Sequence, residues 1–441
     1  MSSSKPSRYL VEPSRRIEGE AAIPGDKSVS HRALLLGSLA EGVTRVDGFL
    51  ESEDCLATLT ALRQLGMLIE RPAAGRVIVH GLGAGRPHGA AGPLDMGNAG
   101  TAMRLFMGYL ASQPFNSTLI GDASLMRRPM ERVAVPLRLM GADIATQEGR
   151  PPVAIRGGRA LKAIDYELPI PSAQVKSAIL LAALRADGRT RIVEPAPSRD
   201  HTERMLAAFG VELLHSNGEM ALQGGQALHA TSVQIPADFS SAAFFIVAAC
   251  LGTGQGVLLR NVGVNPTRTG LLDLLNEMGA DIRVKARDVS SQASAEPVAD
   301  IEVRASSLHG IKVAESAVPL TIDELPVFFI AAACAEGETV VRGAHELRVK
   351  ESDRLSAMAA GLTQLGIEVE LLPDGLWIRG NPDGFDRGTI DSQGDHRIAM
   401  AFAVAATRAR GAIEIRDVAS VATSFPNFLT SARQVGLRIS T

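Results

Sequence analysis

The sequence predicts an α/β protein made of two lobes, each holding three copies of a unit about 70 residues long. The first observation behind this prediction is a recurring glycine, which follows a helix-like stretch and a bulky apolar residue and precedes an alternating strand. It occurs at Gly66, Gly141, Gly210, Gly279, Gly366 and Gly436, at intervals of 75, 69, 69, 87 and 70 residues. Each glycine is expected in the left-handed conformation that ends a helix. The alternation that follows is typical of a half-buried strand.

Two further patterns recur out of phase with these glycines. A turn and a short strand are predicted at 41–48, 115–122, 187–195, 254–262, 336–344 and 410–418. Before each lies an apolar helix candidate, at 28–40, 99–112, 173–185, 239–250, 322–335 and 395–408. Helices that are apolar over most of their circumference are buried, so each unit should hold one helix wrapped by sheet. Units of this size rarely fold alone, and six of them divide naturally into two lobes of three.

Composition excludes several classes of function. The chain has 46% hydrophobic and 21% charged residues, which is ordinary for a globular protein. A net charge of -3 and 4% aromatic residues give neither a basic stripe nor stacking platforms, so no nucleic-acid partner is expected. No apolar run reaches the roughly 18 residues of a membrane span. Cys55, Cys250 and Cys334 are too few and too scattered for a disulfide framework or a metal site, so a reducing cytoplasm is expected.

The apolar helix candidates share polar N-terminal ends. Serine, aspartate and asparagine are explained there as caps, but lysine and arginine oppose the helix macrodipole. An anion bound by backbone amides and cations together would account for them. We therefore expect a ligand with several negative charges, such as a phosphate and a carboxylate. The cations at these ends or in adjacent loops are Lys27, Arg32, Arg104, Arg128, Lys176, Arg199, Lys350, Arg354 and Arg397.

Two acidic residues stand among these cations. Asp323 in TIDELP begins an apolar helix candidate, and Glu351 in LRVKESDRL lies between Lys350 and Arg354. Asp323 alone would be explained as an N-cap, and Glu351 as a salt-bridge partner. A carboxylate held among cations is also a good proton acceptor or relay. The residues alone leave both interpretations open.

The familiar cofactor motifs are missing from the sequence. PGDKS lacks the first glycine of a Walker A loop, and the glycine-rich stretch 81–89 meets Pro87 instead of opening a helix. Neither zinc-ligand spacing nor a GxSxG nucleophile is found. We expect no metal and no cofactor.

Eight segments together resemble the signatures of one family, the 3-phosphoshikimate 1-carboxyvinyltransferases or EPSP synthases. In chain order they are GDKSVSHR, GNAGTAMR, RRPM, SAQVKSAILLAAL, NPTRTG, ELRVKESDRL, DHRIAMAF and SFP. The resemblance implies the enolpyruvyl transferase fold, a two-lobed inside-out α/β barrel in which each lobe has three βαβαββ repeats. The lobes are then expected at 25–237 and at 1–24 plus 238–441, joined by two crossovers.

The resemblance also implies an activity. The family transfers the enolpyruvyl group of phosphoenolpyruvate to the 5-hydroxyl of shikimate 3-phosphate, giving 5-enolpyruvylshikimate 3-phosphate and phosphate. This step lies in the shikimate pathway to chorismate and the aromatic amino acids. It is an addition followed by an elimination, through a tetrahedral phospho-ketal. Both substrates carry a phosphate and a carboxylate, which suit the cation-rich helix ends.

The motif matches carry the family's site residues onto this chain. For shikimate 3-phosphate they imply Lys27, Ser28, Arg32, Ser172, Ala173, Gln174, Arg199 and Lys350. For phosphoenolpyruvate they imply Lys27, Asn98, Gly100, Thr101, Arg128, Arg354 and Arg397. Asp323 should bind substrate and accept the proton of the 5-hydroxyl. Lys27 and Glu351 are candidates for proton transfer at the methylene carbon.

Two other functions are weighed against this one. The sister enzyme that transfers enolpyruvyl to UDP-N-acetylglucosamine usually has a reactive cysteine on a mobile loop, and no cysteine lies between Cys55 and Cys250. A non-catalytic phosphate-binding protein on the same fold would lack Asp323, Glu351 or Lys27, and all three are present.

The resemblance is to the class II branch of the family in particular. GDKS, SAQVK, RDHTE and NPTR look like that branch, which is often associated with tolerance to glyphosate. Gly100 nevertheless stands where some tolerant members carry alanine, so tolerance stays open. A monomer is expected, because closure of two lobes around the substrates needs no partner.

Overall fold

The computed structural model of the chain describes residues 6–216, 218–287 and 296–441. These residues form two compact units. Unit 1 comprises residues 6–24, 237–287 and 297–441, and unit 2 comprises residues 25–216, 218–236 and 296. Each unit has its own hydrophobic core, as is expected of a domain.

Three apolar helices fill the interior of each unit. In unit 2 they are α1 (Lys27–Leu39), α3 (Gly100–Leu110) and α5 (Ala173–Ala183). In unit 1 they are α7 (Phe239–Leu251), α10 (Leu325–Ala333) and α12 (His396–Ala405). Every residue of α7 is buried, because its sequence FSSAAFFIVAACL has no charged position to present to solvent. The buried helices predicted from the sequence are confirmed.

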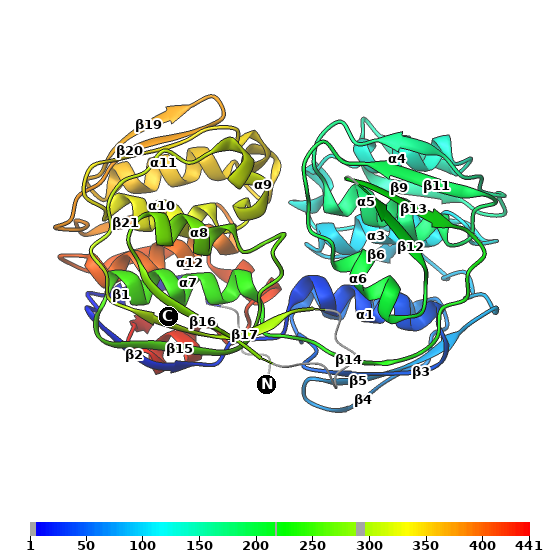
Figure 1. Ribbon diagram of the computed structural model, residues 1–441, viewed down its shortest axis with the longest axis horizontal. Helices are drawn as coiled ribbons and strands as arrows, with labels where there is room; N and C mark the ends of the chain where they lie inside the picture. The colour runs from blue at the N-terminus through cyan, green and yellow to red at the C-terminus, as the bar shows by residue number, and fades with distance from the viewer. Residues whose placement is uncertain (1–5, 217, 288–295) are drawn as a thin grey trace. The chain divides into compact units, whose positions relative to one another are not determined.

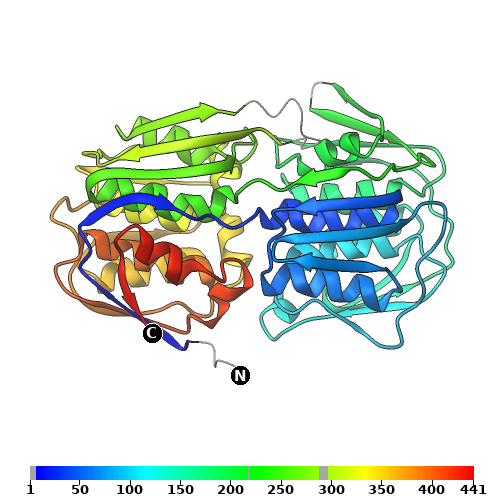
Figure 2. The same ribbon diagram turned by 90° about the horizontal axis from the view of Figure 1, so that it is seen from below.

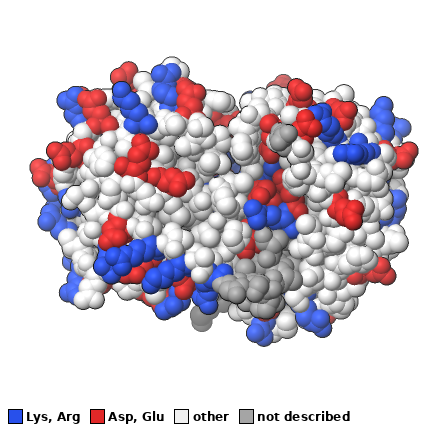
Figure 3. All heavy atoms as spheres, in the orientation of Figure 1, with Lys and Arg blue, Asp and Glu red and all other residues white. Residues whose placement is uncertain are grey.

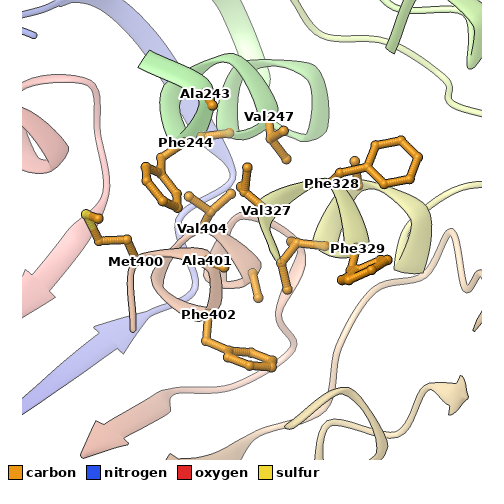
Figure 4. Packing of buried hydrophobic residues seen from close by; sticks show 14 of the residues in the cluster. Ala243, Phe244, Val247, Val327, Phe328, Phe329, Met400, Ala401, Phe402 and Val404 are labelled. Atoms are coloured by element: carbon orange, nitrogen blue, oxygen red, sulfur yellow. The ribbon is translucent and has the colours of Figure 1, made fainter. Parts of the chain in front are cut away.

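The labelled side chains of α7, α10 and α12 belong to the core of unit 1, and Val247, Val327 and Val404 lie toward one another where these helices meet (Figure 4). Phe244 and Val247 come from α7, Val327 from α10, and Phe402 and Val404 from α12. All five are at most 2% exposed. Burying one side chain of this size contributes about 1.5–3 kcal/mol, so helices that are apolar on every side remain inside the unit.

Sheets surround the buried helices in each unit, and in Figures 1 and 2 the strands of each unit lie outside these helices. The described part of unit 2 has three sheets. The strand order of the first is β14 (Ser232–Gln234), β3 (Glu41–Asp47), β5 (Arg76–Leu82), β4 (Ile69–Ala73), and that of the second is β6 (Leu94–Asp95), β7 (Ser117–Ile120), β9 (Arg150–Arg156), β8 (Asp143–Gln147). The third has the order β10 (Asp165–Glu167), β11 (Arg189–Val193), β13 (Glu219–Gln223), β12 (Leu213–Ser216).

The described residues of unit 1 form three sheets in the same manner. Their strand orders are β16 (Asp281–Ala286), β17 (Val298–Arg304), β15 (Thr253–Gly263), β2 (Arg16–Ala21); β18 (Glu338–Val341), β20 (Gly375–Arg379), β19 (Glu368–Leu372); and β21 (Gly388–Asp391), β22 (Ile413–Arg416), β1 (Arg8–Glu12), β23 (Arg438–Ser440).

Strands that are distant in the sequence close these sheets. In unit 2, β14 runs parallel to β3, with Val233 opposite Val46. In unit 1, β2 runs parallel to β15, with Glu20 opposite Leu258. The first strand, β1, lies antiparallel between β22 and β23. The N-terminal strands therefore complete sheets whose other strands come from the second half of the chain.

A second, less buried type of helix alternates with the buried one. These helices are α2 (Glu53–Gln64), α4 (Glu131–Leu139), α6 (His201–Ala208), α8 (Gly270–Glu277), α11 (Arg354–Gln364) and α13 (Phe428–Gln434). Each is followed by one of the six repeat glycines, whose φ angles lie between +84° and +105°, which confirms their predicted left-handed conformation. Short helices connect other elements: α9 (Val318–Thr321), η1 (Leu125–Arg127), η2 (Glu315–Ala317), η3 (His345–Val349), η4 (Ala406–Arg408) and η5 (Ala419–Thr423).

Among the described residues, no single helix is long and apolar enough to cross a membrane. The pair Glu315–Thr321 and Leu325–Ala333 meets the length and composition requirement only when taken together, and it is bent by 118°. Its second helix, α10, belongs to the core of unit 1. On the face shown in Figure 3, positive and negative side chains are interspersed over each unit.

Gly141→Ala is expected to destabilise the protein by about 1–2 kcal/mol, because an L-residue pays this cost in the left-handed region and φ at Gly141 is +99°. The nearest atom to the new Cβ would be the Ala160 carbonyl oxygen at 3.3 Å. Urea unfolding measures the change. Gly92→Ala is the matched control, since nothing lies within 4 Å of a Cβ there, and its effect should stay within about 0.5 kcal/mol. Equal effects of the two substitutions would contradict the assignment of Gly141.

Candidate active site

The buried helices of unit 2 begin in a cluster of polar side chains. Gln174, near the start of α5, donates from Nε2 to Thr101 Oγ1 of α3 at 2.8 Å. Arg32 of α1 donates from Nη2 to Ser177 Oγ of α5 at 2.8 Å. The N-terminal parts of α1, α3 and α5 are therefore joined by their side chains, and most of the site residues expected in this unit lie there.

Lys27 is the first residue of α1. The N-cap is Asp26, whose carboxylate accepts from Val29 N at 2.8 Å. The expectation that serines at these helix starts are caps is therefore wrong for Ser28, the second residue of α1. Lys27 Nζ lies 3.0 Å from Asp54 Oδ2 of α2, and the Lys27 side chain is 17% exposed. A carboxylate from the neighbouring helix thus orients the ammonium group, and the side chain is not fully buried.

Arg32 is buried, and each of its three guanidinium nitrogens donates one hydrogen bond inside unit 2, which leaves two of its five N–H groups for a ligand. Nε donates to Thr202 Oγ1 at 2.6 Å, Nη1 to the Ser28 carbonyl at 3.0 Å and Nη2 to Ser177 Oγ at 2.8 Å. Burial lowers the pKa of Arg32 to about 10, and the charge of Glu203 partly offsets this effect. The side chain is therefore still a cation at neutral pH. Since these three hydrogen-bond partners are neutral groups, Arg32 adds positive charge near the start of α1.

Arg128 and Asn98 form a pair just before α3. Arg128 Nη2 donates to Asn98 Oδ1 at 2.5 Å, and Nη1 donates to the Asn98 carbonyl at 3.2 Å. Asn98 in turn donates from Nδ2 to Asp122 Oδ2 at 2.7 Å. Gly100 makes room for the arginines: a Cβ there would lie 2.8 Å from Arg128 Nη1 and 3.4 Å from Arg104 Nη1. Any side chain at Gly100 would require the Arg128 guanidinium to move.

Arg104 lies beside the expected site residues, but the sequence analysis names it only as one of the cations near the helix ends. Its Nη1 donates to Gln174 Oε1 at 2.6 Å, and its Nη2 donates to the Pro129 carbonyl at 3.1 Å. Because Gln174 also binds Thr101, one arginine holds α3, the start of α5 and the segment that carries Arg128. The signal for Arg104 was present in the GNAGTAMR motif, which ends on it.

The remaining expected residues of unit 2 lie at two helix starts. Ser172 caps α5 by accepting from Val175 N at 3.4 Å, and Ala173 is the first residue of that helix. Arg199 is half-buried and precedes α6 by two residues. Backbone N–H groups at a helix start favour an anion, so these positions suit a phosphate or a carboxylate.

In unit 1, three cations surround the carboxylate of Asp323. Lys350 Nζ lies 3.6 Å and Arg354 Nη1 3.5 Å from Asp323 Oδ1. Arg397 Nη2 lies 3.9 Å from Asp323 Oδ2, and Arg397 Nη1 donates to the Asp323 carbonyl at 2.8 Å. The helix α10 begins two residues later, with Glu324 at its N-cap position. The interpretation of Asp323 as an N-cap is therefore wrong, and its side chain faces the cations instead.

Arg354 is buried at the start of α11 and binds two further carboxylates. Its Nη2 donates to Glu351 Oε2 at 2.5 Å, and its Nε donates to Asp395 Oδ2 at 2.8 Å. Burial by itself would lower the pKa of Arg354, but the charges of Asp395 and Glu351 raise it above its ordinary value. Asp395 also caps α12 by accepting from Arg397 N at 2.9 Å. One carboxylate thus binds the guanidinium of Arg354 and the backbone N–H of Arg397.

Lys350 and Glu351 lie between η3 and α11. Burial lowers the pKa of Lys350 below its ordinary value, although the charge of Asp323 opposes the effect. A lysine with a lowered pKa gives up its proton more readily than an exposed lysine. Two carboxylates and three cations therefore form one group of alternating charge: Asp323, Lys350, Glu351, Arg354 and Arg397.

Lys176 does not have the anion-binding role that was expected of it. Its side chain is 1% exposed, and Nζ lies 2.7 Å from Glu194 Oε2 and 2.6 Å from Glu203 Oε1. It also donates to the Ser198 carbonyl at 3.4 Å. Two buried carboxylates compensate its charge, so the interpretation of Lys176 as a ligand-facing cation is wrong. It ties α5 to α6 and to the residue that follows β11.

Two carboxylates of the site were missed from the sequence. Asp54 holds Lys27 and Asp395 holds Arg354, at distances of 3.0 Å and 2.8 Å. Asp54 lies in the first turn of α2, where acidic residues are common, and Asp395 has the position of an ordinary cap. Each local explanation was sufficient by itself, and only the tertiary structure shows the second partner.

Comparison with known proteins agrees with the motifs. The family model of EPSP synthase (3-phosphoshikimate 1-carboxyvinyltransferase) matches residues 11–431. The chain belongs to this family. A relative from Methylococcus capsulatus, named 3-phosphoshikimate 1-carboxyvinyltransferase, is 56% identical over 98% of both chains. A relative of the same name from Xanthomonas campestris is 53% identical over 99% of both chains.

Solved structures of the family have the same fold. An EPSP synthase from Acinetobacter baumannii matches with a TM-score of 0.87 at 50% identity, over 98% of this chain and 99% of that one. A second structure of EPSP synthase from the same organism gives 0.86 at 49% identity. The predicted two-lobed enolpyruvyl transferase fold and the resemblance drawn from the motifs are both confirmed.

Lys176→Met is expected to lower the free energy of unfolding by about 3–5 kcal/mol, because the buried carboxylates of Glu194 and Glu203 would lose their cation. Chemical denaturation followed by circular dichroism measures the loss. Lys162→Met removes an exposed lysine of the same unit and should change the value by no more than about 0.5 kcal/mol. If Lys176→Met costs less than about 1 kcal/mol, as a surface pair would, the buried ion pairs are not what holds α5 to α6.

Proposed function

We propose that this protein catalyses the 3-phosphoshikimate 1-carboxyvinyltransferase reaction. It transfers the enolpyruvyl group of phosphoenolpyruvate to the 5-hydroxyl of shikimate 3-phosphate and releases phosphate. The observation that carries the proposal is the Asp323 carboxylate among Lys350, Arg354 and Arg397 in a chain of this family. Both substrates are anions, and a carboxylate held beside cations is placed to take a proton from a hydroxyl bound there.

Shikimate 3-phosphate is assigned to helix starts of unit 2 and to one lysine of unit 1. These starts combine backbone N–H groups with cations, which together favour a phosphate or a carboxylate. Arg32, held by Ser177 and Thr202, supports the assignment because its orientation is set before a ligand arrives. The assigned residues are Lys27, Ser28, Arg32, Ser172, Ala173, Gln174, Arg199 and Lys350.

Phosphoenolpyruvate is assigned to arginines of both units. A guanidinium group matches the geometry of a carboxylate or a phosphate with two parallel hydrogen bonds. Asn98 orients Arg128, and Asp395 orients Arg354 and contacts the backbone of Arg397. The assigned residues are Lys27, Asn98, Gly100, Thr101, Arg128, Arg354 and Arg397.

Three residues are assigned to proton transfer. Asp323 accepts the proton of the 5-hydroxyl as that oxygen forms a bond to the central carbon of phosphoenolpyruvate. The methylene carbon gains a proton from Lys27 or Glu351, which gives the tetrahedral phospho-ketal. Phosphate then leaves while the new methyl group loses a proton to Lys27 or Glu351, and the double bond forms again. Proximity of the two bound substrates and proton transfer by placed groups account for the acceleration.

The lobe boundaries, the oligomeric state and the cellular location are part of the same proposal. We assign the two lobes to residues 25–237 and to 1–24 plus 238–441, and the reaction needs residues from both. A monomer in the cytoplasm suits a reaction between two small diffusible anions. Size-exclusion chromatography with light scattering tests the monomer.

Phosphate release tests the reaction itself. The purified chain should release phosphate when phosphoenolpyruvate and shikimate 3-phosphate are both present, and not when either is omitted. Replacing shikimate 3-phosphate with UDP-N-acetylglucosamine should give no release. Release with phosphoenolpyruvate and the nucleotide sugar, and not with shikimate 3-phosphate, would identify the sister activity. Binding of both substrates without release would identify a non-catalytic protein.

Asp323→Ala and Lys27→Met are each expected to lower kcat by about 100-fold or more, since each removes a group assigned to proton transfer. Steady-state assays of phosphate release at saturating substrate concentrations measure the change in kcat. Asp383→Ala removes an exposed carboxylate of unit 1 and should leave kcat unchanged. A near-wild-type kcat for either site variant would remove that residue from the mechanism.

A further inference from the structure

The NPTRTG segment, residues 265–270, matches a family motif but has no role in the reaction described above. Asn265 shapes its turn: Oδ1 accepts from Thr267 N at 2.9 Å and from Thr267 Oγ1 at 2.7 Å. The side chain of Arg268 follows and is only 2% exposed. A buried guanidinium is costly unless it is paired and hydrogen-bonded, and the partners of Arg268 lead toward Asp323.

A continuous series of contacts joins Arg268 to Asp323. Arg268 Nη2 donates to Ser240 Oγ, near the start of α7, at 2.7 Å. The Ser240 hydroxyl donates to Glu324 Oε1. Glu324 Oε1 lies 3.9 Å from Arg397 Nη1, which donates to the Asp323 carbonyl at 2.8 Å. One hydroxyl thus connects a buried arginine to the carboxylate that faces Arg397.

The same segment supports the turn before α10 at a second point. Gly270 begins α8 and packs against Thr321, which is fully buried. A Cβ on Gly270 would lie 2.3 Å from Thr321 Oγ1. The Thr321 carbonyl accepts from Glu324 N at 2.8 Å. Both ends of the turn that carries Asp323 therefore rest on residues 268–270, either directly or through Ser240.

We infer that Arg268, Ser240 and Glu324 are positioning residues for Arg397 and Asp323. Ser240 is 5% exposed and Glu324 is 1% exposed, so they act through Arg397 and not by touching substrate. The Ser240 oxygen accepts a hydrogen bond from Arg268, and its single hydroxyl hydrogen is therefore directed to Glu324. The inference rests on the proposed function, because it takes Arg397 and Asp323 as substrate-facing groups.

Positive and negative side chains alternate along the contacts from Arg268 to Arg397. This alternation explains how Arg268 affects the candidate site. Asp238 Oδ1 lies 3.6 Å from Arg268 Nη2, and Glu324 lies between the Ser240 hydroxyl and Arg397. In a buried environment such charges hold one another more strongly than they would in water. Removal of the Glu324 charge or of the Ser240 hydroxyl should therefore release the Arg397 guanidinium from its orientation.

Ser240→Ala and Glu324→Gln test the inference in the full-length chain. Both should raise the KM for phosphoenolpyruvate about 10-fold, the size expected when a hydrogen bond to a charged group is lost. The KM for shikimate 3-phosphate should stay within about twofold. Ser241→Ala is the matched control, because Ser241 is the next residue of α7 and is 6% exposed. It should change neither KM.

A double variant shows whether the effect passes through Arg397. In an Arg397→Lys background, Glu324→Gln should add less than about twofold to the rise in the KM for phosphoenolpyruvate, because residues that act through one another are not additive. Multiplied effects would overturn the inference. So would a lower kcat with both KM values unchanged, since that result indicates only a smaller folded fraction. Absence of phosphate release by the unsubstituted chain would overturn the proposed function and the inference together.

Discussion

The structure depends on the N-terminal ends of helices that are apolar on every side. Such a helix must be buried, and its first backbone N–H groups then need partners that water does not supply. Asp26, Ser172, Asp238 and Asp395 provide these partners as N-caps. Polar groups are therefore required at the places where the helix starts of each unit meet, and the same groups make these places suitable for anions.

The cations at these ends are held in place by the protein itself. Asp54 binds Lys27, hydroxyl groups of α5 and α6 bind Arg32, and Asp395 with Glu351 binds Arg354. A charged side chain that is already ordered loses less conformational entropy when a ligand arrives. Buried pairs also carry the cost of desolvation, which Lys176 meets with two carboxylates. Structural ion pairs thus lie in the same unit as the cations that we assign to substrate binding.

Much of the fold was predictable because it depends on short-range patterns that recur. A glycine with a positive φ follows each amphipathic helix, and the buried helices lie where apolar runs precede a turn. The pairing of strands distant in the sequence, such as β2 with β15 and β14 with β3, has no comparable local signal. The cations and the two acidic residues of the candidate site were predictable from the helix ends. Their roles came only from the motifs, since nothing local distinguishes the Asp323 carboxylate from a cap.

The sequence by itself determined the six repeats, the buried helices and, through its motifs, the family and the residue types of the site. Only the tertiary structure decided which carboxylate pairs with which cation. It pairs Lys27 with Asp54, Arg354 with Asp395 and Lys176 with two glutamates, and it places Asp323 ahead of α10 instead of at its cap. The physical reason is that periodicity records how each residue faces its own helix or strand. An ion pair depends on where two such elements come together.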